Sequence, residues 1–287
     1  MLGICVVYLV PDADAEFLLK MHLANLKATT EGPYRVYGVA LRMAPGHEQY
    51  LRNAGVVLPE VPPHDPENYK RNNREAGEHS HYLDQLVDVA FGDGCTHVAT
   101  FDMDSWPIAK GWDSHYRKFL APPIPVIGMR RTETNDEFPN PAFTLMGKDF
   151  WRAGKTSFAF FNPRCHYPGA DKSGRAHSGR GILAELDQNG QSFLPVVRVN
   201  RWNPHPIMCG VYDNRIFHFG AGSRQPVFAG DKKDYGLIDT ELAWSYAKAV
   251  NGAKRAFFLE CLRNSGTDFI TQLVYGDLVN RPDAKKA

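Results

Sequence analysis

The chain has 287 residues, of which 43% are hydrophobic and 23% are charged. These proportions are those of a folded globular protein and exclude a wholly disordered one, and the length allows one large domain or two small ones. Lys and Arg number 33 against 32 Asp and Glu, and the net charge of +1 excludes a globally basic protein that binds nucleic acid.

Strands alternate with helices over the first hundred residues. The first strand is predicted at residues 4–10, an apolar run rich in β-branched residues that is typical of a strand buried on both faces. Further strands are predicted at 34–41, 56–61 and 97–101, and helices at 13–28, 46–53 and 79–92. This alternation indicates an α/β fold with a mostly parallel sheet, in which ligands bind beyond the carboxyl ends of the strands.

The second half is less regular, with a Gly-, Arg- and His-rich loop over 162–180. Extended segments are predicted at 126–130, 142–146, 193–199 and 215–219, and helices at 181–189, 237–265 and 267–279.

Cysteine usage and apolar runs bear on where the protein works. The five cysteines are widely spaced and form no C-x-x-C pair, so free thiols in a reducing compartment are expected. The apolar run at 4–10 is too short to span a bilayer and has no features of a secretory signal. We therefore expect the protein in the cytoplasm, where it could touch the inner face of a membrane.

The strongest chemical signal is Asp102-Met103-Asp104, which directly follows the strand predicted at 97–101. Residues i and i+2 of a strand point the same way, so the two carboxylates can converge. They repel each other unless a cation lies between them, and Mg²⁺ or Mn²⁺ takes oxygen ligands that it shares with phosphates. The motif therefore predicts a metal–diphosphate site, with a solvated turn as the alternative.

This order of elements resembles the donor half of a GT-A glycosyltransferase of the family-2-like group. The resemblance is carried by the Asp-x-Asp motif, by residues 80–84 in the preceding helix, and by Trp106-Pro107-Ile108 and Gly111-Trp112 after it. It implies a nucleotide-diphospho-sugar-binding fold, with a mostly parallel central sheet and helices on both faces. Residues 1–150 would bind the donor. Residues 151–287 would form the acceptor half, with C-terminal helices, in the same compact domain.

The same resemblance implies the residues of the site. Mn²⁺ or Mg²⁺ would be held by Asp102, Asp104 and a histidine far downstream, for which His218 is the candidate. Arg224 ends the Gly-rich turn that follows and would bind phosphate. Further contacts to the nucleotide-sugar donor are expected from Arg42, His81, Asp84 and Met103.

An inverting transferase also needs a base that removes a proton from the acceptor hydroxyl. Some relatives carry Asp-Thr-Gly before a helix where this chain has His177-Ser178-Gly179, and this departure leaves the identity of the base open. Asp171 is the first candidate and His177 the second, and Glu185 or Asp187 could also serve. A retaining enzyme would need no such base.

Residues 152–224 carry ten basic and four acidic side chains, an excess of six positive charges in a nearly neutral protein. This excess predicts attraction of a nucleotide diphosphate or of an acceptor on a phospholipid carrier, and a solvated basic face is the alternative. We expect the acceptor to be a saccharide or a lipid-linked molecule. By analogy with the family, the setting would be the synthesis of a surface polysaccharide or a glycolipid.

Three other classes use related patterns. A haloacid-dehalogenase-like phosphatase also has Asp-x-Asp after a strand, but normally after the first strand, whereas roughly a hundred residues precede the motif here. A sugar nucleotidyltransferase would carry a Gly-rich basic loop after the first strand, and residues 10–14 contain none. A non-catalytic protein that binds nucleotide sugars remains the third alternative.

Overall fold

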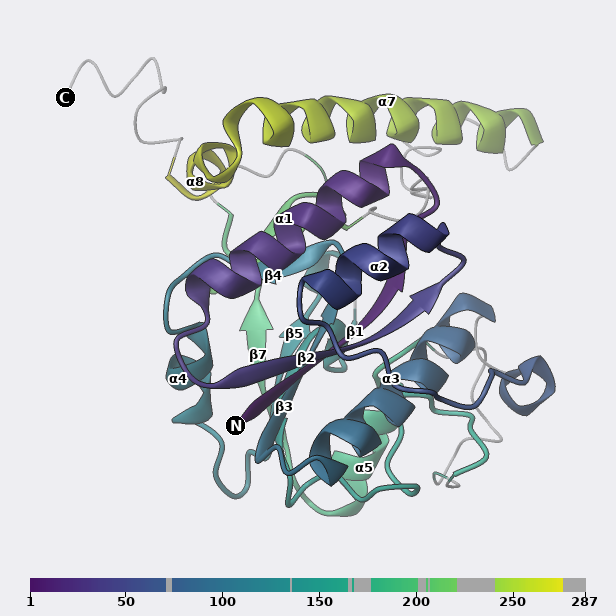
Figure 1. Cartoon of the computed structure of the whole chain (residues 1–287), viewed down its shortest axis with the longest axis vertical. Helices are drawn as coiled ribbons and strands as arrows, with labels where there is room; N and C mark the ends of the chain where they lie inside the picture. Colours follow the sequence, from purple (N-terminus) through teal and green to yellow (C-terminus); the bar gives the residue numbers. More distant parts are fainter. Residues whose placement is uncertain are drawn as a thin grey trace.

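The computed structural model describes residues 1–70, 74–134, 136–164, 167, 177–200, 205, 207–220 and 241–275. Two residues that the sequence singles out, Asp171 and Arg224, lie outside the described residues. The described part contains one large sheet, one small sheet and helices packed around them (Figure 1).

A six-stranded sheet forms the centre of the molecule, with the strand order β2-β1-β3-β6-β5-β7. β1 runs parallel to β2 and β3, and β5 runs parallel to β7, whereas β6 is antiparallel to both of its neighbours. The sheet is therefore mostly parallel, as predicted. Its strands are β1 (Leu2–Leu9), β2 (Tyr34–Leu41), β3 (His97–Asp102), β5 (Val126–Arg130), β6 (Asn140–Gly147) and β7 (Phe193–Val197).

Helices cover both faces of this sheet (Figure 1). One face carries α1 (Ala13–Thr29), α2 (Pro45–Asn53) and α4 (Trp112–Arg117), and the other carries α3 (Arg74–Gly92) and α5 (Arg180–Gln188). The sheet has one apolar core on each face, and β1 contributes to both because successive side chains of a strand point to opposite faces. Ile4 and Val6 pack in the core beneath α1, α2 and α4, whereas Cys5 and Val7 pack in the core beneath α3 and α5.

A small antiparallel sheet extends this core, with the order β4-β9-β8. Its strands are β4 (Ser105–Pro107), β8 (Gly210–Tyr212) and β9 (Ile216–His218). The C-terminal helices α7 (Glu241–Ser265) and α8 (Thr267–Tyr275) share a third apolar cluster with it. Arg255 and Arg263 of α7 both form ion pairs with Asp14 of α1. Among the described helices, none is long and apolar enough to cross a membrane.

Several elements differ from those predicted. The strand expected at 56–61 is reduced to a single bridge between Val57 and Tyr37, because three prolines at 59, 62 and 63 supply no amide hydrogen to a ladder. The polar loop expected before residue 79 contains a short 3₁₀ helix, η1 (Pro66–Tyr69), and α3 begins at Arg74. The three-residue strands β4 and β8 were not predicted. They are too short for periodicity to identify, and their pairing with β9 defines them.

Candidate active site

Three of the predicted metal ligands meet at the carboxyl end of the central strand β3. Asp102 ends β3, the chain turns through Met103 and Asp104, and β4 pairs with β9 so that His218 lies opposite Ser105. His218 Nε2 lies 3.6 Å from Oδ1 of Asp104 and 4.0 Å from Oδ2 of Asp102. One ligand atom from each of Asp102, Asp104 and His218 lies within 4.8 Å of the others.

Backbone amides hold Asp104 in this arrangement. Phe219 donates its N–H to the backbone oxygen of Asp104 at 2.8 Å, and Gly220 donates its N–H to Oδ2 at 3.0 Å. Gly220 has φ +85°, and a Cβ there would lie 2.2 Å from the carbonyl oxygen of Ile207. Glycine is therefore required at this position, both for its backbone conformation and for the close approach.

His218 is buried, with a relative exposure of 3%. Burial lowers the pKa of His218; Asp104 and Asp102 oppose this shift, and Arg131 adds to it. The imidazole is therefore neutral at pH 7 and offers a lone pair to a cation. Two carboxylates and one neutral imidazole fit a divalent ion, and the nitrogen ligand suits Mn²⁺ better than Mg²⁺, which prefers oxygen.

The N-terminal turns of α3 also lie at the carboxyl end of β3. His79 Nε2 lies 3.4 Å from Oδ1 of Asp102. Arg42, one residue beyond β2, donates from its two terminal nitrogens to the two carboxylate oxygens of Glu78, at 2.8 and 2.9 Å. From the sequence alone, His79 is only the first residue of the helix predicted at 79–92. In the structure α3 begins at Arg74, five residues earlier than predicted. The ring of His79 lies within this helix, beside Asp102.

Met103 and His81, which were expected to contact the donor, have other neighbours in the structure. Met103 is 5% exposed, and its side chain packs in the core beneath α1 and α2. His81 Nε2 lies 2.8 Å from the carbonyl oxygen of Pro62, so Nε2 donates, and Nδ1 accepts from the hydroxyl of Tyr69 at 3.2 Å. Through these two hydrogen bonds, His81 of α3 holds the segment that contains Pro62 and η1.

Asp84 is fully buried within the fold. Its carboxylate accepts from Ser157 Oγ at 2.6 Å and from the backbone N–H of Phe158 at 2.8 Å. Burial raises the pKa of Asp84 to about 7, although the nearby Arg164 opposes this shift. These contacts hold the segment that follows β6 against α3, and Asp84 does not belong to the group around His218.

The residues expected to supply a base lie before and within α5. His177 is exposed and precedes the helix, and it acts electrostatically on the carboxylate of Asp136. Burial raises the pKa of Asp136, whereas Arg131 and His177 lower it. Of the other candidates, Glu185 is 2% exposed and pairs with Arg152, and Asp187 is exposed on the helix. The sequence did not single out Asp136.

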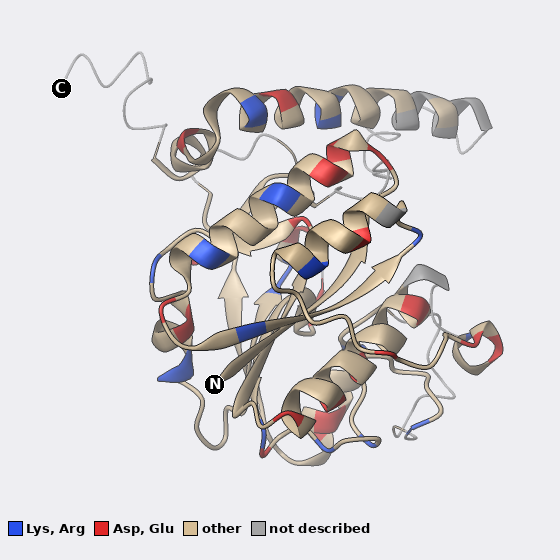
Figure 2. Ribbon diagram, in the orientation of Figure 1, with Lys and Arg blue, Asp and Glu red and all other residues tan. Residues whose placement is uncertain are grey.

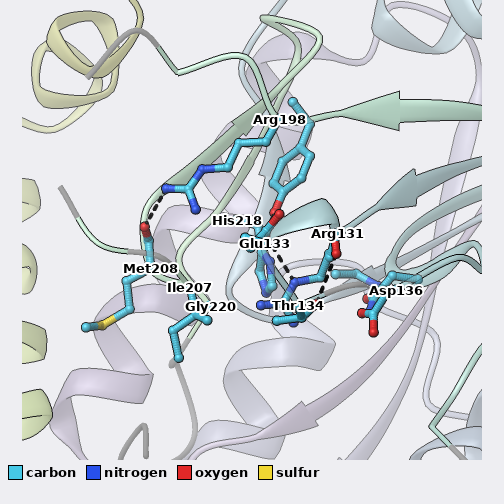
Figure 3. Close-up of polar contacts among 12 residues, drawn as sticks. Arg131, Glu133, Thr134, Asp136, Arg198, Ile207, Met208, His218 and Gly220 are labelled. Atoms are coloured by element: carbon cyan, nitrogen blue, oxygen red, sulfur yellow. Dashed lines mark hydrogen bonds and ion pairs between the residues drawn. The ribbon is translucent and has the colours of Figure 1, made fainter. Parts of the chain in front are cut away.

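A polar segment after β5 lies beside the candidate ligand His218 (Figure 3). Its 3₁₀ turn, η2 (Thr132–Thr134), carries Glu133, whose Oε1 accepts from the hydroxyl of Tyr212 and lies 3.4 Å from Nε of Arg131. Arg131 and Glu133 both influence the charge state of His218. In sequence this segment looks like a solvated loop, because nothing in Arg-Thr-Glu-Thr signals that the side chain of Glu133 is buried.

Some of the basic side chains in residues 152–224 form hydrogen bonds and ion pairs within the protein. Arg164 donates to Asp88 at 2.8 Å, and Nη2 of Arg198 donates to the carbonyl oxygens of His205 and Met208 at 3.1 and 3.0 Å. Along the described ribbon, positions of Lys and Arg are interspersed with positions of Asp and Glu (Figure 2). The contacts of Arg164 and Arg198 leave fewer of their guanidinium donors for an anionic ligand.

Comparison with known proteins gives likenesses of fold only. No protein-family model matches the chain, and no curated protein matches it. Mouse xyloside xylosyltransferase 1 in its apo form is 11% identical over 68% of this chain and 83% of its own, with a TM-score of 0.40. A cytidylyltransferase from Leptospira borgpetersenii is 12% identical over 68% and 74%, with a TM-score of 0.38.

A mannosyltransferase from Pyrobaculum calidifontis, solved with GDP-Man and Mn²⁺, is 12% identical over 52% of this chain and 45% of its own, with a TM-score of 0.35. Two of these three structures are glycosyltransferases, the class that the sequence resembles. Structures this distant show a similarity of fold and say nothing about the activity of this chain.

Proposed function

We propose that this protein is a metal-dependent glycosyltransferase, which moves a sugar from a nucleotide-diphosphate donor to a hydroxyl acceptor. The observation that carries the proposal is the convergence of Asp102, Asp104 and His218 at the carboxyl end of β3. In open α/β sheets, ligands bind beyond the carboxyl ends of the strands, which is where this group lies. Candidate ligands that come from segments more than a hundred residues apart, two of them buried, are unlike a solvated turn.

Asp102, Asp104 and His218 would hold Mn²⁺. Such an ion, when bound, takes up the negative charge of the nucleoside diphosphate that leaves as the glycosidic bond breaks. The two carboxylates alone would repel a diphosphate. The protein's own part is to fix their positions: Gly220 holds Asp104, and His79 lies against Asp102.

We propose that the nucleotide binds at the edge of the sheet where Arg42 meets the N-terminal end of α3. There the exposed guanidinium of Arg42 pairs with the partly buried carboxylate of Glu78 beside the end of β2. Arg224 remains our proposal for a phosphate ligand. Because His81, Asp84 and Met103 are engaged within the fold, we propose for them a supporting role rather than direct contact with the donor.

For the base of an inverting reaction, we propose Asp136 in addition to Asp171. A general base works best when its pKa is near the working pH, and burial raises the pKa of Asp136 in that direction. We keep His177 as a further candidate for the base; its charge lowers the pKa of Asp136 and so opposes the effect of burial. We propose a saccharide or a lipid-linked molecule as the acceptor, in surface-polysaccharide or glycolipid synthesis in the cytoplasm.

Thermal unfolding tests the proposal directly. The panel would combine UDP, GDP, CMP or dTDP with Mn²⁺, Mg²⁺ or EDTA. The proteins are the wild type, Asp104→Asn and the control Asp149→Asn, which removes an exposed charge elsewhere. A nucleotide at 100 times its dissociation constant adds about 2.7 kcal/mol of stability.

We expect a shift for one nucleotide that needs the metal, is lost in Asp104→Asn and is kept in Asp149→Asn. Release of that nucleotide from its sugar donor in the presence of an acceptor would then establish transfer. Stabilisation that is independent of metal and equal in all three proteins would contradict the proposal.

A further inference from the structure

Several buried polar side-chain atoms have no hydrogen-bond partner among the described residues, and Nδ1 of His218 and Oε2 of Glu133 are two of them. The side chains of these residues are only 4% and 7% exposed. Buried polar groups almost always have a partner, so two such atoms of complementary type in one region need an explanation.

The small sheet brings these two residues together. Gly210 of β8 pairs directly with His218 of β9, and directly paired residues of an antiparallel ladder project to the same face. A Cβ on Gly210 would lie 2.6 Å from Cε2 of Tyr212 and 2.9 Å from its hydroxyl oxygen, so this ring lies over Gly210. The same hydroxyl donates to Oε1 of Glu133. The carboxylate of Glu133 is thereby held beside the strand position that carries His218 (Figure 3).

Electrostatic effects agree with this placement. Burial is the main cause that lowers the pKa of His218, and Glu133 is among the groups that act against it. Oε1 of Glu133 is engaged by Tyr212 and by Arg131, so Oε2 is the oxygen left for another donor. The N–H of an imidazole is such a donor.

We propose that Glu133 is a positioning residue for His218, whose Nδ1–H is linked to Oε2 through one bridging water molecule. This link fixes the tautomer in which Nε2 carries the lone pair and faces Asp102 and Asp104. Metal-binding histidines generally donate their second ring nitrogen to such a carboxylate, which orients the ring and strengthens the ligand. The inference rests on the proposed metal site and adds a residue that the sequence motif does not contain.

The first test uses the metal-free wild-type protein and needs no variant of Glu133. Long-range ¹H–¹⁵N spectra of protein labelled in its histidines distinguish the two neutral tautomers, and His218→Gln assigns the resonance. We expect the proton of His218 on Nδ1. A proton on Nε2 would overturn the proposal, whatever metal the protein binds.

The second test measures Mn²⁺ affinity by electron paramagnetic resonance, with folding checked by circular dichroism. For Glu133→Ala we expect binding about 10–100-fold weaker than in the wild type. Glu133→Gln keeps an oxygen acceptor and should restore most of the affinity and the Nδ1–H tautomer. The matched control is Glu137→Gln, which removes an exposed charge from the same segment and should bind as the wild type does.

Failure of this inference can be told apart from failure of the metal site. If Asp104→Asn and His218→Gln bind Mn²⁺ as the wild type does, the metal site itself is refuted. If those two variants lose binding while folded Glu133→Ala keeps the wild-type affinity, only the role of Glu133 is refuted. Should Glu133→Ala not fold, the wild-type tautomer and the Glu133→Gln titration decide the question.

Discussion

Gly220 donates its backbone N–H to Oδ2 of Asp104 at 3.0 Å, although 116 residues separate the two in sequence. The bond links the turn after β3 to the chain just beyond His218. Together with the bond from the Phe219 N–H to the backbone oxygen of Asp104, it joins the two halves of the candidate metal site. A change that moves Gly220 should disturb the cation ligands without touching any of them.

Gly220→Ala should weaken Mn²⁺ binding and destabilise the fold. The added Cβ would lie 2.2 Å from the carbonyl oxygen of Ile207, in a backbone conformation with φ +85° that alanine rarely adopts. We expect a loss of about 1–3 kcal/mol in the free energy of unfolding, measured in urea, together with a weaker Mn²⁺ complex. Gly92→Ala is the control, because nothing lies within 4 Å of its Cβ position. Unchanged Mn²⁺ affinity in Gly220→Ala would mean that this bond does not position Asp104.

The fold and the two carboxylates of the candidate metal site could be predicted because they depend on short, regular signals, whereas His218 was implied by the family resemblance alone. The apolar run of β1 and the Asp-x-Asp pair at the end of β3 are both local patterns. Glu133 and Asp136 could not be predicted, because part of their chemical environment comes from Tyr212 and His177, which lie in other segments. The same limit explains Asp84: a polar residue near the start of a helix looks like a ligand until its buried partners are known.

His79→Ala should reduce Mn²⁺ affinity, by less than His218→Ala does. His79 Nε2 lies 3.4 Å from Asp102 Oδ1, and its loss frees that carboxylate to move. His97→Ala is the matched control, because His97 begins the strand that Asp102 ends and so lies at the far end of it. Titration of all three variants with Mn²⁺ checks the order. Equal affinity of His79→Ala and the wild type would remove His79 from the site.

Asp84 should make the stability of the protein depend on pH. Its folded pKa of about 7 lies above the ordinary value of 3.8, so the folded state favours the protonated form. The stability from this group is fully present below about pH 4 and is lost as the pH rises towards 7. Asp84→Asn stays neutral throughout. We therefore expect the free energy of unfolding of the wild type, relative to Asp84→Asn, to fall between pH 4 and 7, by at most about 4 kcal/mol.

Urea unfolding at several pH values measures this difference, and Asp149→Asn, an exposed carboxylate, should show no such trend. A difference between wild type and Asp84→Asn that stays constant from pH 4 to 7 would mean that Arg164 keeps Asp84 ionised, in spite of its burial.

Asp136→Asn tests whether the structure has identified the base. Asn140 donates to Oδ2 of Asp136 at 3.3 Å, and burial raises the pKa of this carboxyl group. An amide at this position keeps the shape but cannot take a proton, and general base catalysis typically contributes about 10²–10⁴-fold. We expect kcat to fall by that factor while the dissociation constant of the nucleotide stays the same. Glu137→Gln, one residue further along and exposed, should leave both constants unchanged.

The stereochemistry of the product decides how a negative result is interpreted. If Asp136→Asn keeps the wild-type kcat and the anomeric configuration is inverted, the base lies elsewhere, and Asp171→Asn becomes the variant to measure. If the configuration is retained, the reaction requires no such base. The raised pKa of Asp136 would then reflect only its burial between Arg131 and the start of α5.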